Sequence, residues 1–511
     1  MTHRFYDFIR KHAEERPDNP AIIDGAAQIS YSQLLEKIEK FSGALGSLDL
    51  GQDSKLGILC PNGKEYLLAF LGALLKGLPI VPLNFLLTPE DLAFIARDAG
   101  IDVLVVDSMF VKPETAPLAG LFKRRILAGD DAEASRICGQ ATRFEEFLQG
   151  GDRAEGLWRH DRNPAVPDVI LYTSGTTARP KGTMLMEAHF MANCQGVLPY
   201  LPFGPEDRVI MALPLFHSFG NIIALIVLKT GGTLILTRQF APKTILAAIG
   251  QHRATILPLV PTIYSFLVEL YARGGYDVSS LRFCVSGGAA LPEALLRKVE
   301  ETLKVTVIEG YGLTETAPVI AVNAFEGGSV PGSVGPALPN VELKIVDERG
   351  EAVPRGAEGE IWVRGPSIMP GYWNRPEETR ETLTPDGWLK TGDLGRLDKK
   401  NRLYISGGRK KDLIIRAGEN VSPLAIENTL MNHPAVAAAA AVGVPHPRLG
   451  EQVKVCVVLH AGARAEPAEL KEFCRKKLPA FMVPDIVRIY PELPKTASGK
   501  VIKTKLRSAE E

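Results

Sequence analysis

The sequence lacks the features that mark several large classes of protein. Its 59 lysine and arginine residues are balanced by 59 aspartate and glutamate residues, so there is no basic excess of the kind that nucleic-acid-binding proteins show. The most apolar run, Asn221 to Leu228, is too short to span a bilayer. The N-terminal residues MTHRFYDFIRKHAEERPD contain no apolar signal core. We expect neither a nucleic-acid partner nor an integral membrane segment.

Cysteine is scarce and scattered along the chain. No two of the six cysteines stand at the CxxC spacing of zinc sites and redox centres. Several lie in apolar runs, as buried free thiols do. Because free thiols persist in reducing compartments, we expect a cytoplasmic protein without a zinc site.

The length and the order of apolar runs predict a multidomain α/β protein. With 511 residues, of which 45% are hydrophobic, the chain is too long for one compact domain. In the first 330 residues short apolar runs alternate with helical patterns, which is typical of α/β layers with largely parallel sheets. The predicted strands are Leu56–Leu59, Ile80–Leu83, Val103–Val106, Val169–Tyr172, Val209–Ala212, Thr233–Leu236, Ile256–Pro258 and Phe283–Val285, and two predicted helices are Tyr66–Lys76 and Pro292–Leu303.

The pattern of apolar and turn-forming residues changes after residue 332. Short β-like runs separated by Gly, Pro, Asp and Asn predict a small all-β subdomain over residues 332–407. Gly407-Gly408 and the charged residues after them suggest a boundary, so we expect an N-terminal domain of residues 1–407 and a smaller α+β domain of residues 408–511. The alanine run Ala437–Ala441 fits either a buried strand or part of a helix.

One segment has the composition of a phosphate-binding loop. Residues Tyr172 to Gly182, YTSGTTARPKG, follow the apolar run Val169–Leu171 and combine hydroxyls, glycines, an arginine and a lysine. Glycine lets the backbone N–H groups approach a phosphate, and hydroxyls and cations complete the cradle. The segment is not a Walker A loop, because GxxxxGK[ST] is absent. Taken alone, a loop of this composition is more often an ordinary polar surface loop.

Together with four later blocks, this loop resembles the signature motifs of the adenylate-forming superfamily: acyl- and aryl-CoA synthetases, firefly luciferase and the adenylation domains of peptide synthetases. The later blocks occur in the family's order. They are Glu309–Thr316 (EGYGLTET), Thr391–Arg396 (TGDLGR), Gly408–Asp412 (GRKKD) with Gly418, and Pro494–Lys500 (PKTASGK). The resemblance spans the whole chain. It implies a large N-terminal domain of two α/β-layered sheets plus a β-barrel-like subdomain, hinged to the C-terminal domain.

The resemblance implies an ATP site with a role for each block. Tyr311 and Gly287-Gly288 would sandwich adenine, Asp393 would accept both ribose hydroxyls, and Arg409 would add a donor. Without the resemblance, Tyr311 would be interpreted as an aromatic residue of the core. Asp393 and Arg409 would be interpreted as a solvated ion pair. The full implied set is Thr173, Ser174, Gly175, Thr176, Thr177, Lys181, Gly287, Gly288, Ala289, Glu309, Gly310, Tyr311, Gly312, Leu313, Thr314, Asp393, Arg409, Gly418 and Lys500.

The same resemblance implies the catalytic groups. Glu315 and Thr176 would hold Mg²⁺ on the phosphates. Lys500, otherwise an ordinary exposed lysine, would bridge the substrate carboxylate and the α-phosphate as charge builds in the transition state. Lys411 occupies the position of the family's hinge. Gly418 would line the passage for the pantetheine of coenzyme A. ATP, Mg²⁺ and coenzyme A are therefore the expected cofactors.

The acid-binding block, Pro214 to Gly220, contains no carboxylate, which disfavours an amino acid substrate because its ammonium would lack a partner. His217 resembles a gate between the acyl pocket and the thiol tunnel, although an ordinary hydrogen-bonded histidine is the alternative. The implied pocket residues are His217, Phe219, Gly220, Val260, Gly288, Gly312 and Ala317. The motifs look most like those of fatty acyl-CoA synthetases, so we expect a medium- or long-chain fatty acid and a role in lipid metabolism.

Several alternatives stay open at this point. An aryl acid such as a cinnamate or benzoate fits the same pocket. A ligase that loads a carrier protein shares the chemistry. Fatty acyl-AMP ligases carry an extra insertion in the large domain, whereas this chain is near the compact length of the family, which favours CoA as the acceptor. A luciferase-like oxygenase shares the motifs, and a regulator that has lost catalysis is disfavoured by the retained site residues. The oligomeric state is not fixed by the sequence, a homodimer being one option.

Overall fold

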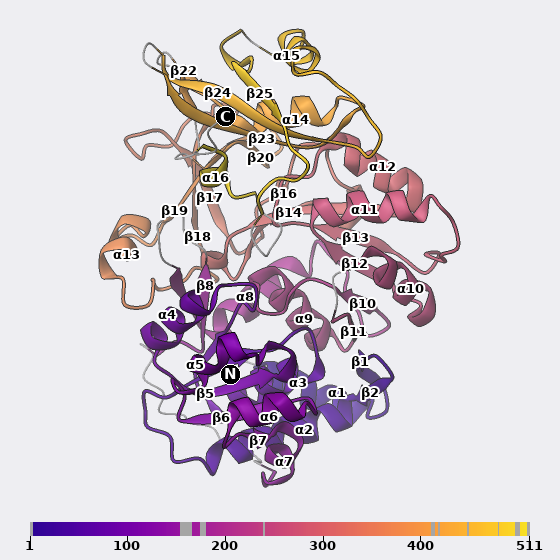
Figure 1. The fold of residues 1–511 in the computed structure, drawn as a ribbon, viewed down its shortest axis with the longest axis vertical. Helices are drawn as coiled ribbons and strands as arrows, with labels where there is room; N and C mark the ends of the chain where they lie inside the picture. Colours follow the sequence, from indigo (N-terminus) through magenta and orange to yellow (C-terminus); the bar gives the residue numbers. More distant parts are fainter. Residues whose placement is uncertain are drawn as a thin grey trace.

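Four β-sheets and their helices make up the protein. The computed structural model describes residues 4–153, 166–173, 180–238, 241–409, 414–416, 419–446, 449–478, 480–495 and 501–507. In Figure 1 the N-terminal strands and helices fill one end of the molecule, and the C-terminal sheet lies at the other. This confirms the predicted fold class.

The first large sheet carries most of the strands after residue 200. Its order is β15-β14-β13-β12-β10-β11-β1-β2. All internal pairs are parallel, and only β2 and β15 at the two edges are antiparallel to their neighbours. The strands are β1 (Pro20–Asp24), β2 (Ala27–Ser30), β10 (Arg208–Met211), β11 (Thr233–Leu236), β12 (Ile256–Leu259), β13 (Phe283–Ser286), β14 (Thr306–Gly312) and β15 (Val319–Val322).

The second large sheet is built from the first half of the chain, in the order β7-β6-β5-β3-β4-β8-β9. It is parallel except for the edge hairpin of β8 and β9. In the sequence, the predicted phosphate loop joins these two edge strands. The strands are β3 (Lys55–Leu59), β4 (Ile80–Pro82), β5 (Ile101–Asp107), β6 (Arg124–Ala128), β7 (Thr142–Arg143), β8 (Val169–Thr173) and β9 (Lys181–Leu185).

Helices pack on both sheets, and the most apolar of them form the core. In α9 every residue of the run Asn221–Leu228 is buried, because this helix is apolar all round and packs within the fold rather than facing water. The helices are α1 (Phe5–Glu15), α2 (Tyr31–Gly46), α3 (Lys64–Lys76), α4 (Pro89–Ala99), α5 (Ala116–Ala119), α6 (Ala132–Cys138), α7 (Phe144–Gln149), α8 (Glu187–Val197), α9 (Ser218–Thr230), α10 (Pro242–His252), α11 (Pro261–Tyr271) and α12 (Glu293–Leu303). None of the helices in the described ranges is long and apolar enough to cross a membrane.

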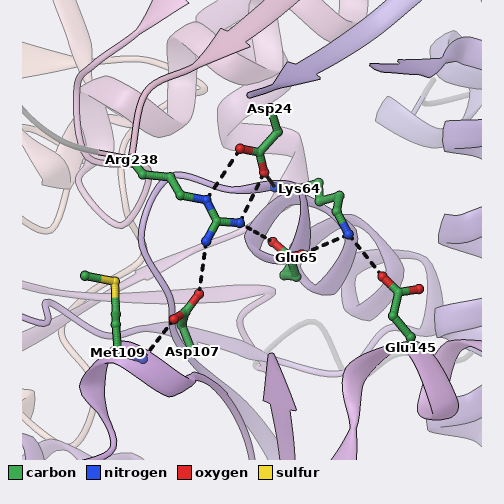
Figure 2. Close-up of polar contacts among 7 residues, drawn as sticks. All are labelled: Asp24, Lys64, Glu65, Asp107, Met109, Glu145 and Arg238. Carbon is green, nitrogen blue, oxygen red and sulfur yellow. Dashed lines mark hydrogen bonds and ion pairs between the residues drawn. The ribbon is translucent and has the colours of Figure 1, made fainter. Parts of the chain in front are cut away.

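An ion-pair network joins the two large sheets (Figure 2). Arg238 follows β11, and its guanidinium nitrogens lie 3.4 Å from Asp24 at the end of β1, 3.2 Å from Glu65 of α3 and 3.5 Å from Asp107 at the end of β5. Desolvation raises the pKa of Asp107. Since Asp24 ends β1 of the first sheet and Asp107 ends β5 of the second, Arg238 links the carboxyl ends of strands from both sheets.

The β-subdomain and the C-terminal domain each have one further sheet. The subdomain sheet is antiparallel, in the order β16-β20-β19-β18-β17, with β16 (Gly335–Pro336), β17 (Glu342–Val346), β18 (Gly359–Arg364), β19 (Leu389–Leu397), β20 (Arg402–Arg409) and helix α13 (Pro376–Thr382). The last sheet has the order β22-β21-β24-β23, with β25 paired to β24. Its elements are β21 (Ile414–Arg416), β22 (Glu419–Val421), α14 (Pro423–Met431), β23 (Val436–His446), β24 (Gly450–Leu459), α15 (Pro467–Arg475), β25 (Ile486–Ile489) and α16 (Lys503–Arg507). The run Ala437–Ala441 is therefore part of a strand.

Candidate active site

Several predicted site residues follow the carboxyl ends of strands in the first large sheet. The loop containing His217 follows β10, Val260 follows β12, Gly287 follows β13, and Glu315 follows β14. In open α/β sheets ligands bind in the crevice outside the carboxyl ends of the strands. Seven predicted positions lie outside the described residues: Ser174, Gly175, Thr176, Thr177, Lys411, Gly418 and Lys500. For Arg409 the backbone is described.

Glu315 lies in a tight turn that follows β14. After β14 the N–H of Leu313 donates to the carbonyl of Pro318 at 3.0 Å, and residues Thr314–Thr316 form one turn of 3₁₀-helix. A Cβ on Gly312 would collide with the Pro318 carbonyl, so only glycine allows this approach. Asn193 of α8, which is fully buried, closes the turn by donating to the carbonyl of Val319 at 2.8 Å.

Tyr372 contacts Glu315, although no motif in the sequence marks Tyr372 as a site residue. The Tyr372 hydroxyl donates to Glu315 Oε1 at 2.8 Å. The Nζ of Lys181 lies 5.5 Å from the centre of the Tyr372 ring, which is within the range of a cation–π contact. Thr173 faces Lys181 across the β8–β9 hairpin. The structure thus brings the base of the phosphate loop and the Glu315 turn together through one aromatic side chain.

The donor set around Glu315 fits magnesium bound mainly through phosphates. The side chain is half-buried, and no described residue donates a hydrogen bond to its second oxygen, Oε2. Among the described residues no three His, Cys, Asp or Glu side chains could hold a metal by themselves. Mg²⁺ usually keeps several waters and is bound by one or two carboxylates plus substrate phosphates. A single carboxylate with an available oxygen matches that pattern.

Tyr311 and Asp393, which the sequence predicted separately, contact each other. The Tyr311 hydroxyl donates to Asp393 Oδ2 at 2.6 Å across 82 residues of sequence. Asp393 is buried in β19, where its backbone pairs with Arg409 of β20 and its N–H donates to Thr391 Oγ1 at 3.1 Å. The contact fixes both the ring and the carboxylate before any ligand arrives.

The glycine pair after β13, Gly287-Gly288, is bordered by two predicted pocket residues, and we call it the Gly287 shelf. A Cβ on Gly287 would lie 3.2 Å from the Phe219 ring, and one on Gly288 would lie 3.5 Å from Val260. Gly288 has a positive φ of 80°, which favours glycine. Gly288 and Ala289 are exposed. Phe219, Val260 and the glycine pair are therefore neighbours, as the predicted adenine and acyl sites require.

Glu309, one of the predicted nucleotide residues, is buried, and its side chain accepts a hydrogen bond from another loop of the protein. It is 4% exposed, and its Oε1 accepts the N–H of Leu291 at 2.8 Å. Its own N–H donates to Ser329 Oγ at 2.9 Å, and its carbonyl accepts the Asn323 side chain at 3.1 Å. Burial raises the pKa of Glu309 to about 7. The carboxylate therefore anchors the end of the loop that begins at Gly287.

The acid-binding block forms the start of α9 and touches the Glu315 turn. His217 caps the helix, and its Nδ1 accepts the N–H of Phe219 at 3.4 Å. Ser218 Oγ lies 3.3 Å from Thr314 Oγ1. A Cβ on Gly220 would collide with the Pro214 carbonyl, and Ala317 is fully buried. The predicted acid-binding residues therefore adjoin the turn that carries Glu315.

Two models of known protein families match this chain. The family model of the AMP-binding enzymes matches residues 9–373, and that of the AMP-binding enzyme C-terminal domain matches residues 425–500.

Three curated relatives differ in the acid they are named for. A long-chain-fatty-acid–CoA ligase of Bacillus subtilis is 33% identical, with 97% of this chain and 92% of the relative aligned. A sulfoacetate–CoA ligase of Cupriavidus necator is 34% identical, covering 98% and 96%. A feruloyl-CoA synthase of an Amycolatopsis species is 33% identical, covering 97% of each chain.

Two solved structures superpose over nearly the full length. ATP-bound MatB of Rhodopseudomonas palustris has a TM-score of 0.87 and 31% identity, covering 99% of this chain and 98% of that one. The anthranilate CoA ligase AuaEII in complex with anthranoyl-AMP has a TM-score of 0.90 and 28% identity, covering 99% and 97%.

Proposed function

Because the chain belongs to the AMP-binding enzyme family, and within it to the AMP-forming acid–CoA ligases, we propose that its substrate is a medium- or long-chain fatty acid. The family reaction uses ATP, a carboxylic acid and coenzyme A and proceeds through an acyl adenylate. The observation that carries the proposal is the apolar character of the predicted acyl pocket, from Phe219 and Val260 to Ala317.

Charge is the second argument for an apolar acid. None of the predicted pocket residues is a lysine, arginine, aspartate or glutamate. A second anionic group on the acid, as in sulfoacetate, or an ammonium, as in an amino acid, would have to be buried there without a counter-charge, which is strongly unfavourable. An alkyl chain has no such requirement, and the B. subtilis relative is named for a long-chain fatty acid.

In the proposed mechanism the protein positions two anions that repel each other. The phosphate loop and Lys181 would hold the phosphates, while Glu315 and Thr176 would hold Mg²⁺, which supplies neutralising charge when bound. Lys500 would sit between the substrate carboxylate and the α-phosphate, where negative charge develops as the oxygen attacks phosphorus and pyrophosphate leaves. Tyr311, the Gly287 shelf and Asp393 would hold adenosine.

Thioester formation would then follow a rotation of the C-terminal domain. We place the hinge at Lys411, directly after β20, with residues 1–407 as the N-terminal domain, 332–407 as its subdomain, and 408–511 as the moving part. Rotation would replace Lys500 at the site by the loop that contains Gly418, along which pantetheine would reach the acyl carbon. His217 would gate that passage. Since the six cysteines are unpaired and buried, we place the reaction in the reducing cytoplasm.

An aryl acid is the second candidate. The ring of Phe219 borders the Gly287 shelf, and aromatic rings pack well against each other. The feruloyl-CoA synthase is as similar to this chain as the fatty acid ligase is. A carrier-protein ligase remains a third option, because it shares the first half-reaction.

The test is acid-dependent exchange of labelled pyrophosphate into ATP, followed by AMP release with and without CoA. The acids are fatty acids from short to long, benzoate and cinnamate. Exchange with fatty acids that is lost in Lys500→Ala, together with CoA-dependent AMP release, is the expected result. Exchange with aryl acids alone would show that the substrate is an aryl acid rather than a fatty acid. Exchange without CoA-dependent release would indicate a carrier-protein acceptor.

A further inference from the structure

A short segment of the β-subdomain, Gly371 to Arg375, lies along the outer edge of β9. The N–H of Met184 donates to the Gly371 carbonyl at 3.1 Å, and the N–H of Trp373 donates to the Gly182 carbonyl at 2.7 Å. Thr183 and Tyr372 form an antiparallel bridge between these two bonds. We call this segment the strap, because it adds a backbone ladder to the strand that leaves the phosphate loop.

The strap is also fixed at its far end. The indole Nε1 of Trp373 donates to the carbonyl of Asp98 on α4 at 3.0 Å, and Arg375 pairs with the Asp98 carboxylate at 3.2 Å. The same carboxylate accepts the Tyr172 hydroxyl at 2.7 Å. These bonds connect the subdomain to the base of the β8–β9 hairpin and make the strap a defined platform.

Tyr372 is the strap residue that faces the candidate site. Its N–H donates to Thr379 Oγ1 at 2.9 Å, so the backbone that carries it is fixed. Its hydroxyl donates to Glu315 Oε1 at 2.8 Å, and its ring lies under the ammonium of Lys181. One side chain therefore contacts the two groups that the proposed function assigns to Mg²⁺ and the phosphates.

We propose that Tyr372 is a positioning residue that orients the Glu315 carboxylate for the magnesium–ATP complex. The hydrogen bond occupies Oε1 and leaves Oε2 for the ligand. A glutamate side chain has three rotatable bonds, and fixing it before ATP arrives removes an entropic penalty from binding. Because the hydroxyl donates to the residue that the proposed function assigns to Mg²⁺, we expect the effect in the nucleotide step. This inference rests on the role proposed for Glu315.

The experiment measures ATP binding by calorimetry across a Mg²⁺ titration without acid, for the wild-type protein, Tyr372→Phe and the control Tyr6→Phe. Phenylalanine keeps the ring over which Lys181 lies and removes only the hydroxyl. We expect the Mg²⁺ concentration at half-saturation to rise about tenfold in Tyr372→Phe, the loss expected for one hydrogen bond to a charged group. Tyr6→Phe removes a similar hydroxyl-to-carboxylate bond, from Tyr6 of α1 to Glu39 Oε1 of α2 at 2.9 Å. Neither helix carries a predicted site residue, so this variant should lower the melting temperature without changing the Mg²⁺ response.

Two outcomes would overturn the proposal. An unchanged Mg²⁺ response in Tyr372→Phe would do so, as would an equal shift in both variants, since the bond would then matter only for folding. A double-mutant cycle gives an independent test: in a Glu315→Gln background, Tyr372→Phe should cause no further shift, and additive effects would contradict the model. Pyrophosphate exchange by the wild-type protein is measured in parallel, and its absence with every acid would reject the proposed function, while the binding data still decide the role of Tyr372.

Discussion

Replacing Glu309 by glutamine should change how the stability of the protein depends on pH. The buried carboxyl has a pKa of about 7 in the folded protein, against an ordinary value of 4.5, and desolvation is the cause. Between these two values the unfolded chain ionises at this position while the folded chain keeps its proton. Stability is therefore lost as pH rises from about 4.5 to about 7, and the loss is complete above that range.

The magnitude follows from the size of the shift. At 1.36 kcal/mol per unit, the full effect is about 3 kcal/mol, most of which falls between pH 5 and pH 8. Glutamine has nearly the same shape, can still accept the N–H of Leu291, and does not ionise. We expect the stability of Glu309→Gln relative to wild type to rise by roughly 2 to 3 kcal/mol between pH 5 and pH 8.

The assay is urea unfolding followed by tryptophan fluorescence at pH 5, 6, 7 and 8. Glu300→Gln is the matched control, because Glu300 accepts the N–H of Val307 on the same strand at 3.0 Å but is more exposed. Its stability relative to wild type should change much less with pH. A difference between Glu309→Gln and wild type that is constant from pH 5 to pH 8 would refute the reasoning, because the carboxyl would then ionise as readily in the folded protein as in the unfolded chain.

Two further substitutions test the geometry of the site. Gly312→Ala places a Cβ against the Pro318 carbonyl and should destabilise the protein by about 3 kcal/mol, since backbone cannot give way as a side chain can; a melting temperature equal to that of wild type would show that the turn relaxes. Tyr311→Phe removes the hydroxyl that donates to Asp393 and should raise the KM for ATP about tenfold with little change in the KM for the acid; equal increases in both constants would show that the pair does not act on the nucleotide alone.

The strands with strong apolar signals were predicted well from the sequence. The predicted Thr233–Leu236 is β11, and the predicted Val103–Val106 lies within β5 (Ile101–Asp107). The signal was clear because central strands of parallel sheets are buried on both faces and read as continuous apolar runs. β9 and β14 were missed, since their sequences KGTML and TVIEGYG contain charge and glycine. Both are stabilised by pairing with neighbours rather than by their own composition.

The site was predictable only where a motif carried it. Tyr311 and Asp393 were assigned from separate blocks, but their contact depends on how the subdomain folds back, across 82 residues. Tyr372 gave no local signal, because its position is set by the strap pairing with β9 and its partner Glu315 is 57 residues away. The contacts of Glu309 could not be foreseen either, as the Leu291 N–H that it accepts comes from another loop.

The most direct test of the central claim is a competition for coenzyme A. The enzyme is given ATP, CoA and an equimolar mixture of a medium-chain fatty acid, a long-chain fatty acid, cinnamate and benzoate, and the acyl-CoA products are quantified by mass spectrometry. We expect a fatty acyl-CoA to dominate, because none of the predicted pocket residues is a lysine, arginine, aspartate or glutamate. Predominance of cinnamoyl- or benzoyl-CoA, or accumulation of acyl adenylate without any CoA thioester, would contradict it.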